Sequence, residues 1–108
     1  MAKRPLLVVR LRVDPNHEEA FTRWYHLEYL DTLLSIAPLF VSCRRYVSRE
    51  GDDKVFLTIY EIQDEASIDA ALAVFDRPER QEHRRQWQAW EQRALRDVDS
   101  RVFVPIYP

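Results

Sequence analysis

The chain has 108 residues, a formal net charge of −2 and 46% hydrophobic residues, which fits one globular domain with a hydrophobic core. The slightly acidic balance argues against the basic surface that nucleic-acid binding needs. Gly51 is the only glycine. The chain can therefore form neither a phosphate-binding P-loop nor the Gly-rich turn of a dinucleotide site.

The single cysteine and the short apolar runs indicate a cytoplasmic protein. Cys43 has no partner for an internal disulfide and falls in a strand-like segment. This favours a small buried hydrophobic residue in a reducing compartment over a reactive thiolate. No apolar run is long enough to span a membrane, and the one after Pro5 ends at Arg10, too early for a signal peptide.

The N-terminal part predicts a strand at residues 6–13 and a helix from Asp14 to about Leu34. Side chains in the strand alternate between an apolar face and a mixed face. Asp14 is suited to cap the helix and Pro15 to occupy its first turn. The apolar residues of the strand are Leu7, Val9, Leu11 and Val13.

Residues 40–48 and 54–62 alternate in the same way and predict a β-hairpin. The polar run at residues 49–53 between them is typical of a turn. In the second segment, we expect the side chains that face the helices to be Val55, Leu57 and Ile59.

The C-terminal part predicts a second helix and a last strand. Asp64 or Ser67 begins the helix, which restarts at Pro78 and continues to about Arg96. Residues 101–107 alternate and form the strand. The order β-α-β-β-α-β predicts one ferredoxin-like α+β domain over residues 1–108, with a four-stranded antiparallel sheet covered by helices on one face.

The other faces of the strands mix charged and aromatic side chains, which is unusual for a sheet that faces solvent. Such a face indicates a second sheet packed against it, and we expect a homodimer. A monomer with an amphipathic open face is the alternative. The residues expected near the dimer joint are Arg10, Tyr46, Tyr60 and Phe103.

Two stretches, FTRWYHLEYL at residues 21–30 and PLFVSCRRY at residues 38–46, carry a family pattern. They resemble F-x-x-W-Y-x-x-E-H-(I/L)-P … P-G-F-x-x-x-R-R-Y of EthD-like proteins. Tyr29, Asp31 and Leu39 depart from that pattern, which has His, Pro and Gly there. The matching residues are Phe21, Trp24, Tyr25, Glu28, Pro38, Phe40, Arg44, Arg45 and Tyr46.

The resemblance implies a dimeric α/β barrel, a superfamily that includes polyketide cyclases, small monooxygenases, muconolactone isomerases and haem enzymes. One fold of this kind hosts many reactions, so the resemblance implies a fold and a dimer more than a reaction. Because Tyr29 replaces the histidine of the pattern, an acid–base step by that imidazole is excluded here.

Glu28 is a candidate acid or base, because a helical wheel places it on the same face as Phe21, Trp24 and Tyr25. Apolar surroundings raise the pKa of a carboxyl group and suit it to proton transfer. An ion pair with an arginine of the sheet, such as Arg45, is the alternative.

His83 is a second candidate for proton transfer. Trp87, Trp90 and Ala94 follow it at helical spacing, so we expect this stripe, His83 included, to face the sheet. A packed core histidine is the alternative. His26 lies nearly opposite Glu28 on the wheel and is expected at the surface.

The leading hypothesis is a cofactor-independent enzyme that acts on a small aromatic or polyketide-like molecule by cyclisation, isomerisation, dehydration or oxygenation. Its pocket would lie between helices and sheet. The alternatives are a non-catalytic ligand-binding or structural homodimer, and a haem protein with His83 as axial ligand. No metal-binding or cofactor motif is visible in the sequence. The catalytic candidates are Glu28, Tyr29 and His83, and the substrate-binding candidates are Trp24, Tyr25, Arg45, Tyr46, Trp87 and Trp90.

Overall fold

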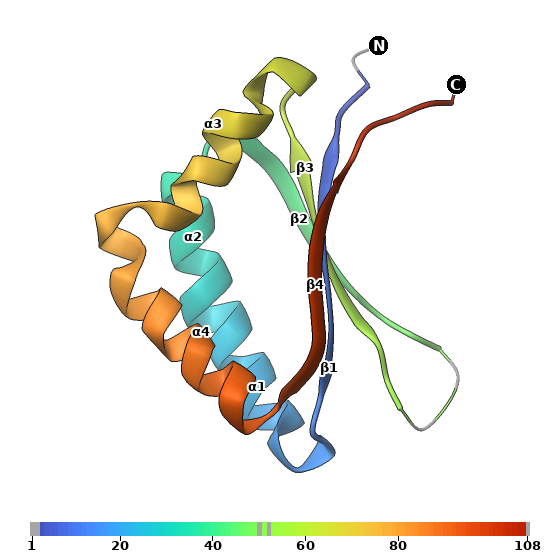
Figure 1. The fold of residues 1–108 in the computed structure, drawn as a ribbon, viewed down its shortest axis with the longest axis vertical. Helices are drawn as coiled ribbons and strands as arrows, with labels where there is room; N and C mark the ends of the chain where they lie inside the picture. The colour runs from blue at the N-terminus through green and yellow to red at the C-terminus, as the bar shows by residue number, and fades with distance from the viewer. Residues whose placement is uncertain (1–2, 50, 52, 108) are drawn as a thin grey trace.

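The elements follow one another in the predicted order β-α-β-β-α-β and form two layers, a sheet and a layer of helices on one of its faces (Figure 1). This computed structural model describes residues 3–49, 51 and 53–107. The predicted domain limits at residues 1 and 108 and the turn residues 50 and 52 lie outside the described residues. The antiparallel sheet has the strand order β2-β3-β1-β4. Its strands are β1 (Leu6–Val13), β2 (Phe40–Val47), β3 (Phe56–Ile62) and β4 (Leu95–Phe103).

The first helical region joins β1 to β2. The side chain of Asp14 accepts a hydrogen bond from the backbone N–H of Asn16 at 3.0 Å, which confirms the predicted cap. The region ends two residues later than predicted, just before Pro38. Its segments are a 3-10 turn η1 (Pro15–His17), α1 (Glu18–Trp24), a π-helix η2 (Tyr25–Leu30) and α2 (Asp31–Ile36).

The π-helix η2 changes which side chains of this region are buried. Phe21, Tyr25, Leu30 and Leu33 are buried, so the step from Tyr25 to Leu30 is five residues instead of three or four. A π-turn holds one residue more than an α-turn and shifts the following side chains around the helix axis. Wheel positions based on 3.6 residues per turn therefore no longer hold after Tyr25.

The second helical region joins β3 to β4. The side chain of Asp64 accepts a hydrogen bond from the backbone N–H of Ser67 at 2.8 Å and caps it. The helix restarts at Pro78, as predicted, but ends at Arg93 instead of about Arg96. Its segments are η3 (Glu65–Ser67), α3 (Ile68–Ala73), η4 (Val74–Asp76), η5 (Pro78–Arg80) and α4 (Gln81–Arg93).

The last strand differs from its prediction at both ends. β4 begins at Leu95 and ends at Phe103, whereas alternation predicted residues 101–107. Its first half, with mostly polar side chains, is held by backbone pairing with β1, which a side-chain pattern does not reveal. A bulge interrupts this pairing, and Asp97 takes a φ of 53° there. Aspartate tolerates the left-handed region better than most residues.

The faces of β2 and β3 correct a second prediction. Thr58 and Tyr60 are each 1% exposed beneath the helices, so Tyr60 is not at the open face where a partner would bind. Leu57 and Ile59 instead lie on the open face. In β2, a register shift between Phe40 and Ser42 adds one residue and reverses the alternation after Phe40.

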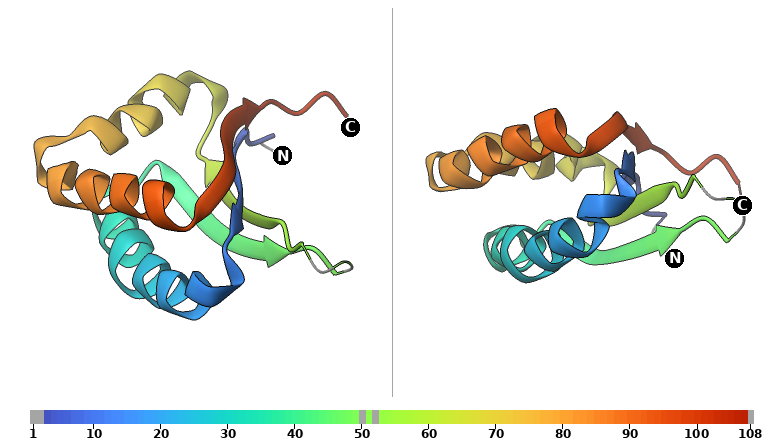
Figure 2. Two further views of the ribbon diagram at one scale, coloured as in Figure 1. Left: turned by 60° about the horizontal axis from the view of Figure 1, so that its bottom comes forward. Right: turned by 90° about the horizontal axis from the view of Figure 1, so that it is seen from below.

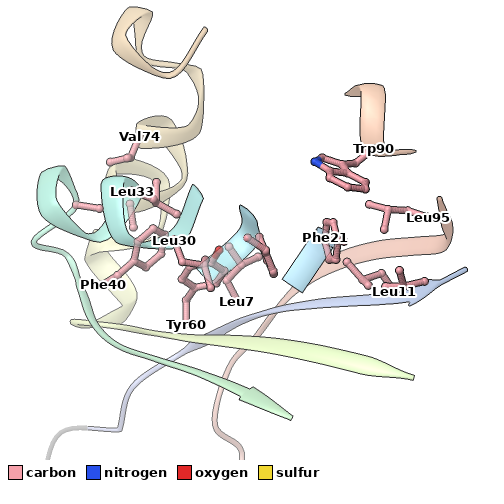
Figure 3. Packing of buried hydrophobic residues seen from close by; sticks show 14 of the residues in the cluster. Leu7, Leu11, Phe21, Leu30, Leu33, Phe40, Tyr60, Val74, Trp90 and Leu95 are labelled. Carbon is pink, nitrogen blue, oxygen red and sulfur yellow. The ribbon is translucent and has the colours of Figure 1, made fainter. Parts of the chain in front are cut away.

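The core lies between the helical layer and the sheet (Figure 3). Phe21 and Trp90 meet over Leu11 at one end, and Phe40 packs near Leu33 at the other. The two helical regions lie side by side over the sheet (Figure 2). Within the described residues, no helix combines the length and apolar character that crossing a membrane requires.

Candidate functional site

A cavity of about 200 Å³ lies between the two helical regions and the sheet. It is lined by side chains from all three parts of the fold, most of them apolar or aromatic. An apolar pocket with a few polar groups is the usual form of a small-molecule site. The lining residues are Leu7, Val9, Tyr25, Tyr29, Tyr60, Leu72, Phe75, Trp87, Val98 and Ser100.

Three tyrosines supply most of the polar groups of this cavity. Tyr25 shares a hydrogen bond of 3.0 Å between its hydroxyl and Oγ1 of Thr58. Burial raises the pKa of Tyr25 to about 12 and raises the pKa of Tyr29 and, more strongly, that of Tyr60. All three phenols are therefore neutral near pH 7 and act as hydrogen-bond donors or acceptors, not as anions.

Aromatic packing fixes the orientation of these phenols. The ring of Trp87 lies 5.6 Å from that of Tyr25 and 5.5 Å from that of Tyr29, between centroids. Trp24 packs on Tyr29 at 5.3 Å, and its indole N–H donates to Oε1 of Gln86 at 2.9 Å. This cross-link between α1 and α4 holds the walls of the cavity at a fixed distance.

His83 lies beside the cavity, against Tyr29, and does not line it. The edge of its ring meets the ring of Tyr29 at a centroid distance of 6.3 Å and 85°. It thus faces the first helical region, not the sheet as predicted, and is partly exposed. Its Nδ1 is buried without a partner among the described residues. Partial burial and Arg80 lower its pKa, and Glu28 opposes that shift.

The structure contradicts the predicted position of Glu28. Its side chain is exposed and does not line the cavity, although Phe21 and Tyr25 are buried. The π-helix is the reason, because its extra residue turns position 28 away from the buried face. Glu28 also does not pair with Arg45. Its remaining link to the site is electrostatic, through His83.

Arg45, a predicted substrate-binding residue, contacts Tyr25 but does not line the cavity. Its guanidinium carbon is 4.7 Å from the centroid of Tyr25 and 5.5 Å from that of Phe56. Its Nη1 donates to Nε2 of His26 at 3.0 Å, at the surface where His26 was expected. Arg45 therefore touches a cavity residue without reaching the cavity.

The other predicted substrate-binding residues divide between cavity, core and surface. Trp87 lines the cavity, whereas Trp90 is buried against Phe21 and lies outside it. Trp24 packs against the ring of Tyr29 and does not itself line the cavity. Tyr46 is 48% exposed on the open face of the sheet, away from the cavity. Its strand alternates, so a residue beside Arg45 in sequence points to the opposite face.

Sequence reasoning placed one residue of the site, Tyr60, on the wrong face of the sheet and missed another, Arg80. Tyr60 was assigned to the open face because the aliphatic residues around it looked like the buried set. Arg80 is 1% exposed and its guanidinium carbon lies 4.7 Å from the centroid of Tyr29. Charged residues are almost never fully buried, so the pattern gave no signal for Arg80.

No family model and no curated protein matches the chain. Solved structures do match. A NIPSNAP-like domain protein from Burkholderia xenovorans has a TM-score of 0.66 and 16% identity, covering 96% of this chain and 89% of that one. A putative antibiotic biosynthesis monooxygenase from Bacteriodes thetaiotaomicron has a TM-score of 0.65 and 15% identity, covering 98% and 92%. SnoaB, a cofactor-independent oxygenase from Streptomyces nogalater, has a TM-score of 0.58 and 22% identity, covering 99% and 97%.

The chain has a ferredoxin-like α+β fold, which it shares with these structures. At these identities the likeness concerns the fold alone, and it confirms the predicted fold class. The narrower resemblance to EthD-like proteins rests on the residue pattern at positions 21–46.

The remaining titratable groups offer few other sites. Burial raises the pKa of Cys43 to about 11, so its thiol stays protonated near pH 7, which disfavours the thiolate alternative. Among the described residues, no group of three His, Cys, Asp or Glu side chains is placed to hold a metal ion.

We expect His83 to titrate below its ordinary pKa of 6.5, since partial burial and Arg80 disfavour the imidazolium. A histidine whose pKa is lower in the folded state contributes stability above pH 6.5 and loses it as the pH falls through the folded value. Proton NMR of the ring resonances, assigned with His83→Gln, measures this. A titration at or above the ordinary value contradicts the described contacts.

Proposed function

We propose that this chain is a cofactor-independent enzyme that acts on a small aromatic or polyketide-like molecule in the cavity between helices and sheet. The observation that supports it most is the meeting of three neutral phenols and an indole around one apolar space. SnoaB and the putative antibiotic biosynthesis monooxygenase share the fold and lend support to an enzyme of this kind. The pattern at positions 21–46 supports membership of the EthD-like branch.

The proposed chemistry is stabilisation of an enolate. A carbonyl or phenolic oxygen of the ligand would accept hydrogen bonds from Tyr29 and Tyr60, which stay protonated. As a proton leaves the carbon next to the carbonyl, negative charge grows on that oxygen, and positioned donors in a dry site lower the energy of this state. Isomerisation, cyclisation, dehydration and cofactor-free oxygenation of aromatic ketones all can begin with such an enolate.

His83 is the proposed proton acceptor. Its lowered pKa keeps the imidazole neutral near pH 7, the form that can accept a proton. His83 does not line the cavity, and its ring lies against that of Tyr29 at 6.3 Å between centroids, so the proton that leaves the ligand carbon would reach the imidazole through a bridging water beside Tyr29. Glu28 would act only on His83, by favouring the imidazolium that forms.

The size of the cavity limits the size of the substrate. Ligand pockets commonly measure about 300–1,000 Å³. A space of about 200 Å³ favours one or two fused rings over the larger skeleton of a multi-ring polyketide.

Removing single hydroxyl groups tests the proposal. We expect Tyr29→Phe and Tyr60→Phe each to lower kcat about 10²- to 10³-fold on an aromatic ketone or quinol found by thermal-shift screening, as loss of one oxyanion donor does. Tyr107→Phe is the matched control, because Tyr107 is 89% exposed and does not line the cavity, so its loss of a hydroxyl should leave kcat unchanged.

The outcomes of this experiment distinguish an enzyme from a non-catalytic ligand-binding protein. Ligand binding with no turnover of any candidate, under air or without oxygen, would favour the non-catalytic alternative. Equal activity of Tyr29→Phe, Tyr60→Phe and wild type would contradict the proposed role of the phenols. Failure of every aromatic probe to bind would contradict the site itself.

We also propose that the protein works as a homodimer, joined through the open face of the sheet. Apolar side chains on this face include Val8, Leu57 and Ile59, and Phe103 there is 51% exposed. Two broad hollows on the same face contain Arg10, Arg44 and Tyr46 beside these residues. An exposed apolar surface rimmed by charges is typical of an interface.

A further inference from the structure

We propose that the cavity binds its ligand as an anion, with a delocalised oxyanion such as a phenolate, an enolate or an aromatic carboxylate. This deepens the proposed function and depends on it for the site. Two of the three cavity tyrosines each have a guanidinium over the ring, and among the described residues neither guanidinium forms an ion pair.

Arg80 is the more deeply buried of the two arginines. Its side chain is 1% exposed, with the guanidinium carbon 4.7 Å from the centroid of Tyr29. Nη2 donates to the backbone oxygen of Tyr29 at 3.4 Å, and Nη1 is buried without a partner among the described residues. A buried charge that no opposite charge balances is costly in a protein interior. An anion in the adjacent cavity would supply the balancing charge.

Arg45 repeats this arrangement at Tyr25. Its guanidinium carbon is also 4.7 Å from the ring centroid, and its Nε is buried without a partner in the described part of the chain. The contact of its Nη1 with His26 involves a neutral imidazole and does not offset the charge. Burial lowers the pKa of His26, and Arg45 lowers it further, which keeps that ring neutral near pH 7.

The charged groups that act on Tyr29 are mainly positive. The described residues that line the cavity include no charged side chain. Arg80 and Arg84 favour the anionic form of Tyr29, whereas the opposing effect of Glu91 is smaller. Arg84 is also held by carbonyl oxygens, those of Phe75 and Arg77, and not by a carboxylate. The charges nearest Tyr29 therefore favour an anion beside it and offset part of the desolvation that burial imposes, and they act more strongly in a dry site than in water.

The tyrosine hydroxyls and the guanidinium groups would act together on one ligand. The phenols would donate hydrogen bonds to the oxygen that carries the negative charge, and the guanidinium groups that lie over the rings of Tyr25 and Tyr29 would stabilise that charge at short range. Charge-assisted hydrogen bonds of this type are stronger than those to a neutral oxygen. A neutral ligand of the same shape lacks this contribution.

Binding of 4-nitrophenol and its neutral methyl ether, 4-nitroanisole, tests the inference. Each probe has one ring, and the absorbance of the first distinguishes phenol from phenolate. We expect the intact protein to bind 4-nitrophenolate at least about tenfold more tightly than 4-nitroanisole, a difference of about 1.4 kcal/mol. The bound 4-nitrophenol should also lose its proton at lower pH than the free probe.

Three arginine variants provide the controls. Arg80→Met and Arg45→Met should each reduce the preference for the anion several-fold and leave 4-nitroanisole binding within about twofold. Arg93→Met should change neither, because Arg93 stacks at 4.2 Å on Trp90, a ring outside the cavity. If Arg80→Met does not fold, Arg45→Met and the charge-retaining Arg80→Lys make the comparison.

Binding of 4-nitroanisole as tightly as 4-nitrophenolate would overturn the inference and leave the proposed enzyme standing. An anion preference that survives both Arg80→Met and Arg45→Met would overturn it as well. If neither probe binds to the intact protein, the proposed function and the inference fail together.

Discussion

Replacing Phe21 by alanine is expected to lower the free energy of unfolding by about 3–5 kcal/mol, the usual cost of removing a fully buried aromatic ring. Phe21 is 0% exposed. Its ring stacks on Tyr25 at 5.2 Å and meets Trp90 edge-on at 5.5 Å, both between centroids. Since small domains have total stabilities of about 5–15 kcal/mol, this one change removes a large fraction of the margin.

Urea unfolding monitored by circular dichroism measures this effect. Leu27→Ala is the matched control in the same helical region, because Leu27 is 68% exposed and its loss should change stability by less than about 0.5 kcal/mol. A loss below about 1 kcal/mol for Phe21→Ala would mean that the surrounding rings close the space, in conflict with a rigid aromatic cluster.

The fold was predictable from the sequence because its main signals are local. Alternation in β1 gave both ends of the strand correctly, Asp14 marked the cap of the first helical region, and Asp64 was one of two candidates for the cap of the second. Pro78 marked the break between α3 and α4. Each of these signals is contained within a few consecutive residues, so no knowledge of the partner element was needed.

The candidate site was less predictable because single extra residues change the faces of its elements. The π-helix turned Glu28 away from the buried face. The bulge in β2 reversed the alternation after Phe40, so Phe40 does not share a face with the residues that strict alternation groups with it. One signal was present, since the apolar residues Tyr25 and Leu30 are five apart. Nothing in the pattern indicated that Arg80 is buried, because its contacts come from Tyr29, far away in the chain.

The open face of the sheet carries side chains that differ in part from those predicted. Tyr60 was expected at the dimer joint and is buried under the helices, whereas Arg10, Tyr46 and Phe103 are exposed on the open face. Leu57 and Ile59 lie on the open face, although they were predicted to face the helices, and Thr58 and Tyr60 face the helices instead. The open face is consequently more aliphatic than expected, which favours a partner sheet more than the predicted mixture did.

Ile59→Asp is expected to convert the proposed homodimer to a monomer. Ile59 lies on β3, a central strand, and contributes to a hollow on the open face. In a dimer joined through this face, the new carboxylate would be buried without a partner, which costs several kcal/mol per subunit. In a monomer the same carboxylate reaches water, so the fold itself should persist, because Ile59 does not belong to the core beneath the helices.

Light scattering at micromolar concentration checks the change in mass, and circular dichroism checks that the variant is folded. Leu27→Asp is the matched control, since it places the same charge on an exposed position of the helical layer and should leave the dimer intact. The melting temperature of the wild type should rise with protein concentration, whereas that of Ile59→Asp should not, because only association makes stability depend on concentration. A monomer mass for the wild type at the same concentration would show that the open face remains in contact with water.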